Sequence, residues 1–117
     1  MLLAGGFNGN PVSDAELFDP TTGSFSRTGS MGSPRADHTA TLLNDGTVLV
    51  AGAFSFSAPL ASAEVFDPTT SKFAPTGSME TPRYIHTATL LNTGQVLVTG
   101  GSSDLLFTAL KSAELYK

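Results

Sequence analysis

Residues 15–22 read Ala-Glu-Leu-Phe-Asp-Pro-Thr-Thr, and residues 63–70, which lie 48 positions further on, read Ala-Glu-Val-Phe-Asp-Pro-Thr-Thr. The likeness extends well beyond this stretch, since 26 of the 38 positions in 15–52 are identical in 63–100. The flanks follow the same pattern, because residues 2–6 are similar to 49–53 and residues 113–116 are similar to 63–66. A period of roughly 40–50 residues indicates copies of one supersecondary unit.

Each copy contains four short stretches that favour β-strands. The first two are residues 38–43 and 48–51, the next two are residues 15–18 and 24–28, and all have counterparts in the following copy. Asn44-Asp45-Gly46 predicts a tight hairpin turn, because Asn and Gly tolerate positive φ. Pro20 ends a strand because proline lacks the N–H that a ladder needs. No window shows a sustained helical period, so the sequence predicts an all-β fold.

The composition of the 117 residues narrows the possible functions. The net charge is −4 with no cluster of Lys and Arg, which argues against nucleic-acid binding. No run approaches the ~20 apolar residues of a membrane span. Cysteine is absent, which excludes disulfides, cysteine-based zinc sites and thiol catalysis. No motif indicates a cofactor, and none is expected.

The repeat resembles a kelch repeat of the bacterial, galactose-oxidase-like style. The residues that carry the resemblance are Pro34-Arg35 and Pro82-Arg83, His38 and His86, the glycines that follow the second strands (Gly5-Gly6, Gly52, Gly100-Gly101), and the aromatics Phe18, Phe66, Tyr116, Phe25 and Phe73. Two features depart from the family pattern. Phenylalanine stands where the family usually has Tyr and Trp, and Ala53 replaces the second glycine of a pair.

The resemblance implies a β-propeller of four-stranded antiparallel blades, with Phe18, Phe25, Leu42 and Val50 filling the gaps between blades. Residues 1–28 then supply three strands of one blade, residues 29–76 a complete blade, and residues 77–117 three strands of the next. Propellers typically close with 4–8 blades, so we expect a partial kelch propeller of about two and a half blades with an incomplete ring. Because residue 1 falls within an expected strand, we expect a piece of a longer propeller rather than a self-assembling unit.

Three types of polar residue recur at fixed positions of the repeat, which favours a structural role for each. They are Glu16, Glu64 and Glu114, Arg35 and Arg83, and His38 and His86. A buried carboxylate between apolar neighbours needs a partner, so we expect these Glu residues to accept hydrogen bonds from the repeat arginines or from backbone N–H groups. The alternatives are a histidine metal site, a glycosidase-like carboxylate pair and a Ser-His-Asp triad. Neither a third metal ligand nor a nucleophile motif supports them.

The segments that differ between copies are candidates for ligand binding, because a blade does not dictate them. They are the loops between the second and third strands (residues 7–14, 54–62 and 102–112) and between the fourth and first strands (residues 32–37 and 80–85). Both kinds of loop fall at one end of an up-and-down sheet, so we expect one binding face. The candidate ligand-binding residues are Phe54, Phe56, Arg83, Tyr84, Ile85, Asp104 and Phe107.

The sequence therefore favours a non-catalytic scaffold that binds a protein or a carbohydrate through this face. One alternative is a fragment of a larger galactose-oxidase-like or other carbohydrate-active enzyme whose catalytic residues lie outside the chain. The resemblance to galactose oxidase implies a copper site with a Tyr–Cys crosslink, which a chain without cysteine cannot build. Another alternative is assembly with further blades or other copies through open strand edges. By analogy with exported bacterial kelch proteins, we expect an extracellular or cell-surface location if a missing N-terminus carries a signal.

Overall fold

Every regular element of the computed structural model, which describes residues 1–117, is a β-strand. The ten strands are β1 (Leu2–Ala4), β2 (Ala15–Asp19), β3 (Ser24–Arg27), β4 (Thr39–Leu42), β5 (Val48–Ser55), β6 (Ala58–Asp67), β7 (Lys72–Thr76), β8 (Thr87–Leu90), β9 (Val96–Thr99) and β10 (Ala113–Tyr116). They pair into three antiparallel sheets, β1–β2–β3, β4–β5–β6–β7 and β8–β9–β10. The expected all-β class is confirmed, and no helix is present that is long and apolar enough to cross a membrane.

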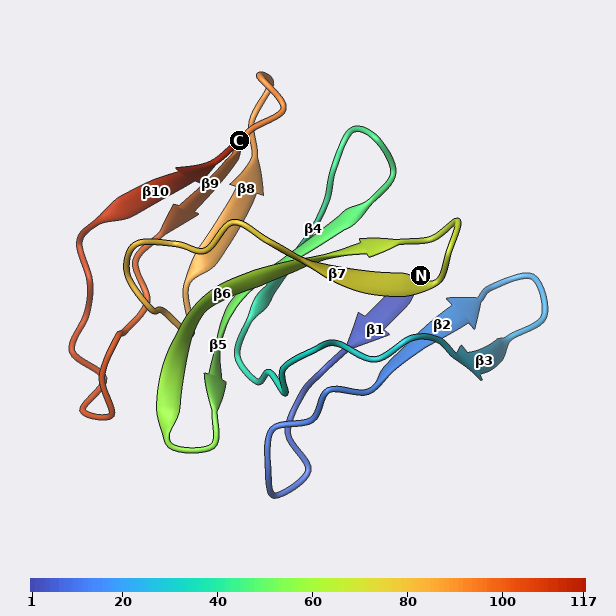
Figure 1. The fold of residues 1–117 in the computed structure, drawn as a ribbon, viewed down its shortest axis with the longest axis horizontal. Coiled ribbons are helices and arrows are strands. Elements are labelled where there is room, and N and C mark those ends of the chain that lie inside the picture. The colour runs from blue at the N-terminus through green and yellow to red at the C-terminus, as the bar shows by residue number, and fades with distance from the viewer.

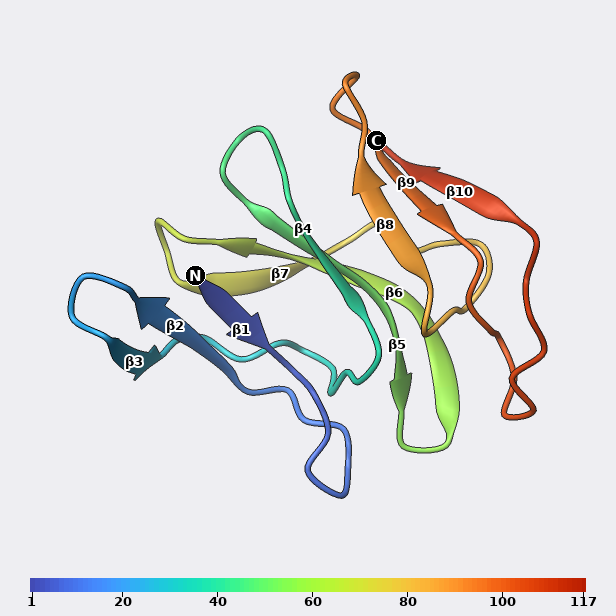
Figure 2. The ribbon, with the colours of Figure 1, turned by 180° about the vertical axis from the view of Figure 1, so that it is seen from behind.

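The three sheets lie side by side in chain order, with the four-stranded sheet between the other two (Figure 1). The view from behind shows the same order (Figure 2), and β4 contacts β8 where the second and third sheets meet. The sheets fan outward and do not close on themselves in either view. This arrangement is consistent with kelch-type propeller blades in an incomplete ring.

The second strand of the complete sheet is longer than the sequence predicted. β5 was expected to end at Ala51, but it continues past Gly52 to Ser55. The pairing with β6 shifts register between Ala51 and Ala53, and Gly52 takes a φ of 65° that suits glycine. The bulge lets the β5–β6 hairpin project beyond the ends of the other strands, toward the loops described below.

The apolar core lies between the second and third sheets. Leu49, Ala51 and Ala63 of the second sheet meet Val96 and Val98 of the third, and all five are buried. On the opposite face of the second sheet, Val50 is also buried completely. Alternate residues of β5 are thus buried on both faces, as the sheet-on-sheet packing of blades requires.

Two of the four side chains expected between blades are exposed. Leu42 is 64% exposed, while its repeat counterpart Leu90 packs against the core. The reason is that Leu90 faces the second sheet, whereas Leu42 faces the first sheet, which contains no counterpart of β4. Phe25 is also exposed, since it stands on the outer strand β3, where its ring packs against Phe18 with ring centroids 4.9 Å apart.

Candidate functional site: the loop face and its supports

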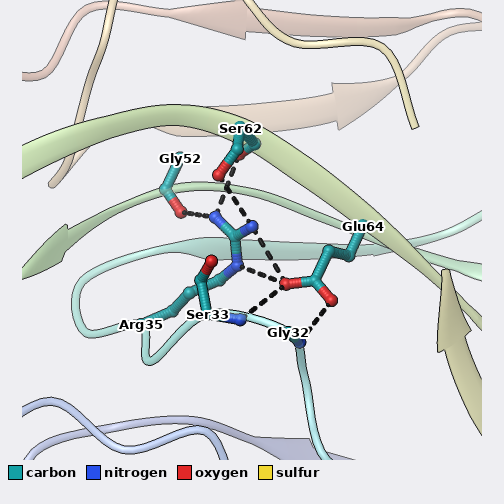
Figure 3. Close-up of polar contacts among 6 residues, drawn as sticks. All are labelled: Gly32, Ser33, Arg35, Gly52, Ser62 and Glu64. Atoms are coloured by element: carbon teal, nitrogen blue, oxygen red, sulfur yellow. Dashed lines mark hydrogen bonds and ion pairs between the residues drawn. The ribbon is translucent and has the colours of Figure 1, made fainter. Parts of the chain in front are cut away.

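A buried ion pair supports the loop that leads into β4. The Arg35 side chain is completely buried and donates from Nε and Nη2 to Oε2 of Glu64 on β6, at 3.2 and 3.0 Å (Figure 3). Its Nη1 donates to the carbonyls of Gly52 and Ser62, and Nη2 donates to Ser62 Oγ. The carboxylate also accepts the backbone N–H groups of Gly32 and Ser33. Loop and sheet are therefore joined by a network that satisfies both charges.

A similar network recurs in the third sheet, except that the buried Nε of Arg83 has no hydrogen-bond partner. Arg83 donates from Nη2 to Oε2 of Glu114 at 3.1 Å, and to the backbone carbonyls of Gly100 and Ser112 from Nη1. Glu114 also accepts the backbone N–H groups of Glu80 and Thr81, and these bonds oppose the effect of partial burial and hold its pKa below the usual value. The hydrogen bonds expected for Glu64 and Glu114 are thus present, because both carboxylates accept from a repeat arginine and from backbone N–H groups.

Glu16 differs from its two counterparts. Its side chain is exposed, and it forms neither an ion pair nor a hydrogen bond in the structure. The physical reason is that Glu64 and Glu114 each pair with an arginine about thirty positions earlier in the chain, whereas residues 1–15 contain no arginine that could pair with Glu16. The expectation that all three carboxylates are buried and paired is therefore wrong for the first sheet.

The two histidines lie close to the arginines of these networks, His38 near Arg35 and His86 near Arg83. The His86 Nε2 and Thr39 Oγ1 atoms are 2.9 Å apart, which links the third sheet to the second. Burial, together with the nearby Arg83 guanidinium, lowers the pKa of His86 to about 4. Burial also lowers the pKa of His38, and the positive charge of Arg35 adds to this effect. Both imidazoles are therefore neutral near pH 7. No group of three or more His, Asp or Glu side chains is placed to hold a metal ion.

Backbone hydrogen bonds bring the divergent loops to one end of the molecule. Ala36 and Phe54 exchange two such bonds, at 3.0 and 2.7 Å, and Tyr84 and Ser102 exchange two at 3.1 and 3.0 Å. The N–H of Ile85 donates to the carbonyl of Asp37, which ties the loop before β8 to the loop before β4. The N–H of Gly6 donates to the carbonyl of Arg35 and so adds the first sheet. The loop face is therefore one connected surface built by all three sheets.

A pocket of about 400 Å³ opens on the loop face. Its lining residues are Phe7, Ala36, Asp37, Phe54, Tyr84, Leu105 and Phe107. Ala36 and Tyr84 are buried and form the floor, whereas Phe7, Leu105 and Phe107 are more than half exposed and form the rim. The Tyr84 ring lies 5.4 Å from Phe54 and 5.9 Å from Phe107, both in tilted contacts. Most of the lining is apolar, and Asp37 is the charged residue in it.

Three of the seven candidate ligand-binding residues line this pocket, namely Phe54, Tyr84 and Phe107. Phe56 and Ile85 are exposed beside it, in left-handed backbone conformations with φ of 55° and 50°. Arg83 is completely buried in its own sheet, so its side chain is not available to a ligand at this face, contrary to the expectation. Asp104 is used inside its own loop, where bonds from Thr108 and the backbone of Leu106 lower its pKa.

The sequence interpretation missed three lining residues, Phe7, Ala36 and Asp37. Phe7 falls in a segment that was recognised as divergent, but no pattern distinguished it from its neighbours. Leu105 lies within residues 102–112, which the sequence placed on the binding face. Ala36 and Asp37 carried a usable signal, because the next copy has Tyr84 and Ile85 at these positions. The same divergence that selected Tyr84 would have selected its counterpart.

Comparison with known protein families gives one match. The search of curated proteins returned no significant match to the chain. A family model described as the Kelch motif matches residues 1–32, which contain β1, β2 and β3. The Kelch motif suggests a protein-interaction type of scaffold. Together, the match over the first sheet and the three antiparallel sheets support a kelch-repeat family.

Proposed function

We propose that the chain is a non-catalytic binding module that receives an apolar side chain of a protein partner in the loop-face pocket. The observation that carries this proposal is the convergence of loops from all three sheets on one aromatic pocket. A buried floor with an exposed aromatic rim matches the anatomy of interface hot spots, which place large apolar anchors in well-packed pockets. Exposed apolar residues beside it, Leu106 and Phe56, extend the surface that a partner would cover.

The composition of the pocket favours binding over catalysis. Asp37 and Tyr84 are the titratable groups in the lining, and the Tyr84 hydroxyl donates to the Asp104 carbonyl at 2.6 Å. One exposed carboxylate without a second acid, base or nucleophile beside it does not form a catalytic set. The same shortage of polar groups favours a peptide over a carbohydrate, whose hydroxyls need several hydrogen-bonding partners.

Selection from a random peptide display library on the immobilised chain tests this proposal. We expect enriched peptides to share an aromatic or aliphatic anchor. We also expect Phe107→Ala to weaken their binding by at least about tenfold, as for a hot-spot residue. Phe25→Ala is the matched control, because Phe25 is similarly exposed but stands on β3, away from the pocket lining. Equal binding to the wild type and to Phe107→Ala, or binding of glycans in place of peptides on an array, would contradict the proposal.

A further inference from the structure

The aromatic pocket of the loop face contains one charged group, and that group has no partner within the chain. Asp37 lines the pocket, and its side chain is exposed. The two ion pairs of the structure use Glu64 and Glu114. The hydrogen bond that Asp37 accepts from the N–H of Ile85 ends on its backbone carbonyl and not on its carboxylate. The negative charge of Asp37 is therefore available to a ligand that enters the pocket.

Four aromatic rings make up most of the remaining lining. Phe7 and Phe107 stand on the exposed rim, and Phe54 and Tyr84 complete the set. The Tyr84 ring is inclined by 50° to Phe54 and by 60° to Phe107, so these rings do not stack flat on one another. The face of an aromatic ring carries a negative potential that attracts a cation within about 6 Å of the ring centre. The rings and the carboxylate thus favour the same guest, a positively charged one.

A neutral apolar guest suits the rings but not the carboxylate. If a hydrocarbon covers Asp37, the charged group loses water and gains no partner, which weakens binding. A guest of the same shape with a positive charge avoids this loss, because the opposite charges attract each other. The pocket should therefore prefer a cation to a neutral group of equal size.

The hydrogen-bonding capacity of the pocket separates one kind of cation from another. The ammonium of lysine and the guanidinium of arginine both carry several N–H donors. Asp37 is the one carboxylate in the lining, and the Tyr84 hydroxyl is already bonded to the Asp104 carbonyl. N–H donors that turn toward the rings would therefore lose water without finding an acceptor, which is costly. A trimethylated ammonium keeps the positive charge, has no N–H donor and packs its methyl groups on aromatic faces.

We propose that the loop-face pocket binds a trimethylated lysine side chain of the protein partner. This inference rests on the proposed function and deepens it, because the pocket and the class of partner are the same. The methyl groups supply the apolar surface that the pocket receives, and the positive charge lies among the rings, next to Asp37. The volume of about 400 Å³ leaves room for this head group.

Titration of the isotope-labelled full chain with a short, glycine-flanked peptide that contains trimethyl-lysine tests the proposal by nuclear magnetic resonance. The matched probe is the same peptide with carbon in place of the ammonium nitrogen, which keeps the shape and removes the charge. We expect amide shifts at Asp37, Tyr84 and Phe107, and binding of the neutral probe that is weaker by at least about tenfold. The peptide with unmodified lysine should also bind more weakly, because its N–H groups lose water.

Asp37→Asn separates the charge of the pocket from its shape. Asparagine tolerates the positive φ of this position, so the variant is expected to fold. It should reduce the preference for the charged probe over the neutral one by at least about threefold. Glu80→Gln is the matched control and should leave that preference unchanged, because Glu80 is exposed and does not line the pocket. Phe107→Ala should weaken the binding of both probes.

Equal binding of the charged and neutral probes would overturn the proposal and leave the proposed function standing, because the pocket would then accept any apolar side chain. Equal binding of the trimethylated and unmodified lysine peptides, or no shifts with either probe at about 5 mM, would also overturn it. Binding that Phe107→Ala does not weaken would place the ligand outside the pocket and would contradict the proposed function as well. Binding to phosphatidylcholine vesicles without binding to the peptide would assign the pocket to a lipid head group and overturn the proposal.

Discussion

The hydroxyl of Tyr84 donates a hydrogen bond of 2.6 Å to the backbone carbonyl of Asp104. The two residues belong to different loops, since Tyr84 precedes β8 and Asp104 follows β9. The backbone of Tyr84 also pairs with Ser102, so two kinds of bond fasten the β9–β10 loop to the pocket floor. The rim residues Leu105 and Phe107 follow Asp104 directly, and their positions therefore depend on this contact.

We expect Tyr84→Phe to loosen the pocket rim while it preserves the aromatic floor. The variant removes the hydroxyl and leaves the Asp104 carbonyl without its partner, which should lower the free energy of unfolding by about 1 kcal/mol. Hydrogen exchange at the amides of residues 105–108 should become faster, whereas exchange within β5 should be unchanged. Unchanged exchange in residues 105–108 would show that the loop is held without this bond.

Substitution of Gly52 should be costly because two other parts of the chain approach it closely. A Cβ atom at this position would clash with the Arg83 carbonyl and lie 2.7 Å from His86 Cε1. Gly23 has a similar positive φ but open space around it, so Gly23→Ala measures the cost of the backbone conformation alone, about 1 kcal/mol. We expect Gly52→Ala to cost a further 1–3 kcal/mol or so from overpacking. Urea denaturation checks both values, and equal losses would contradict the close approach.

Ile85 is a β-branched residue in a left-handed conformation, with φ of 50°. Its counterpart Asp37 has nearly the same φ, 54°, which an aspartate tolerates better. We expect Ile85→Asn to raise the free energy of unfolding by about 1 kcal/mol, because it relieves backbone strain at an exposed site. Leu106→Asn replaces another exposed apolar side chain at a position without a positive φ, and it should give no gain. A loss of stability in Ile85→Asn would show that the isoleucine side chain contributes more than its strain costs.

The buried His86 should make the fold sensitive to mild acid. Its pKa is about 4 in the folded chain, against 6.5 for a free histidine, so only the unfolded state takes up a proton between these values. The free energy of unfolding should therefore fall as the pH is lowered from 6.5 toward 4, and the loss should cease below 4. Stability measured at pH 7.5 and pH 5 checks this, with His86→Gln as the comparison. An equal decline in the variant would assign the acid sensitivity to other groups.

The carboxylates titrate in a lower range and act in the same direction. Hydrogen bonds from threonines and backbone N–H groups hold the pKa values of Asp19, Asp45 and Asp67 below 3.8. Their contribution is therefore intact at pH 5 and is lost only as the pH falls through their folded pKa values. A decline in the free energy of unfolding that begins above pH 5 is therefore caused by protonation of histidine in the unfolded state.

The repeat made much of the fold predictable. Leu49, Val96 and Phe66 belong to apolar strand stretches that occur more than once, so their burial followed from the pattern. The extension of β5 was not predictable, because Gly52 reads as the end of a strand unless the bulge and its partner strand are known. Local sequence carries strand preference but not the register that a neighbouring strand imposes.

The candidate site was predictable only as a face, not as a set of contacts. Sequence differences between the copies located the loops, because the packing of the blade does not dictate which residues stand there. They did not separate Arg83, which is locked inside its sheet, from Tyr84 beside it, which forms the pocket floor. Arg83 and Tyr84 are neighbours in the chain, and successive side chains of an extended backbone point in opposite directions. The sequence pattern alone does not show which of the two side chains faces the pocket.

The ranking of three variants at one repeat position tests most directly whether buried arginine–glutamate pairs lock the loop face to the sheets. Glu64 is 5% exposed, Glu114 is less buried, and Glu16 is exposed and unpaired. Urea denaturation should show a loss of about 3–5 kcal/mol for Glu64→Gln, a smaller loss for Glu114→Gln and no measurable loss for Glu16→Gln. Equal losses for all three variants, or a Glu64→Gln variant that is as stable as the wild type throughout pH 4 to 8, would contradict the account.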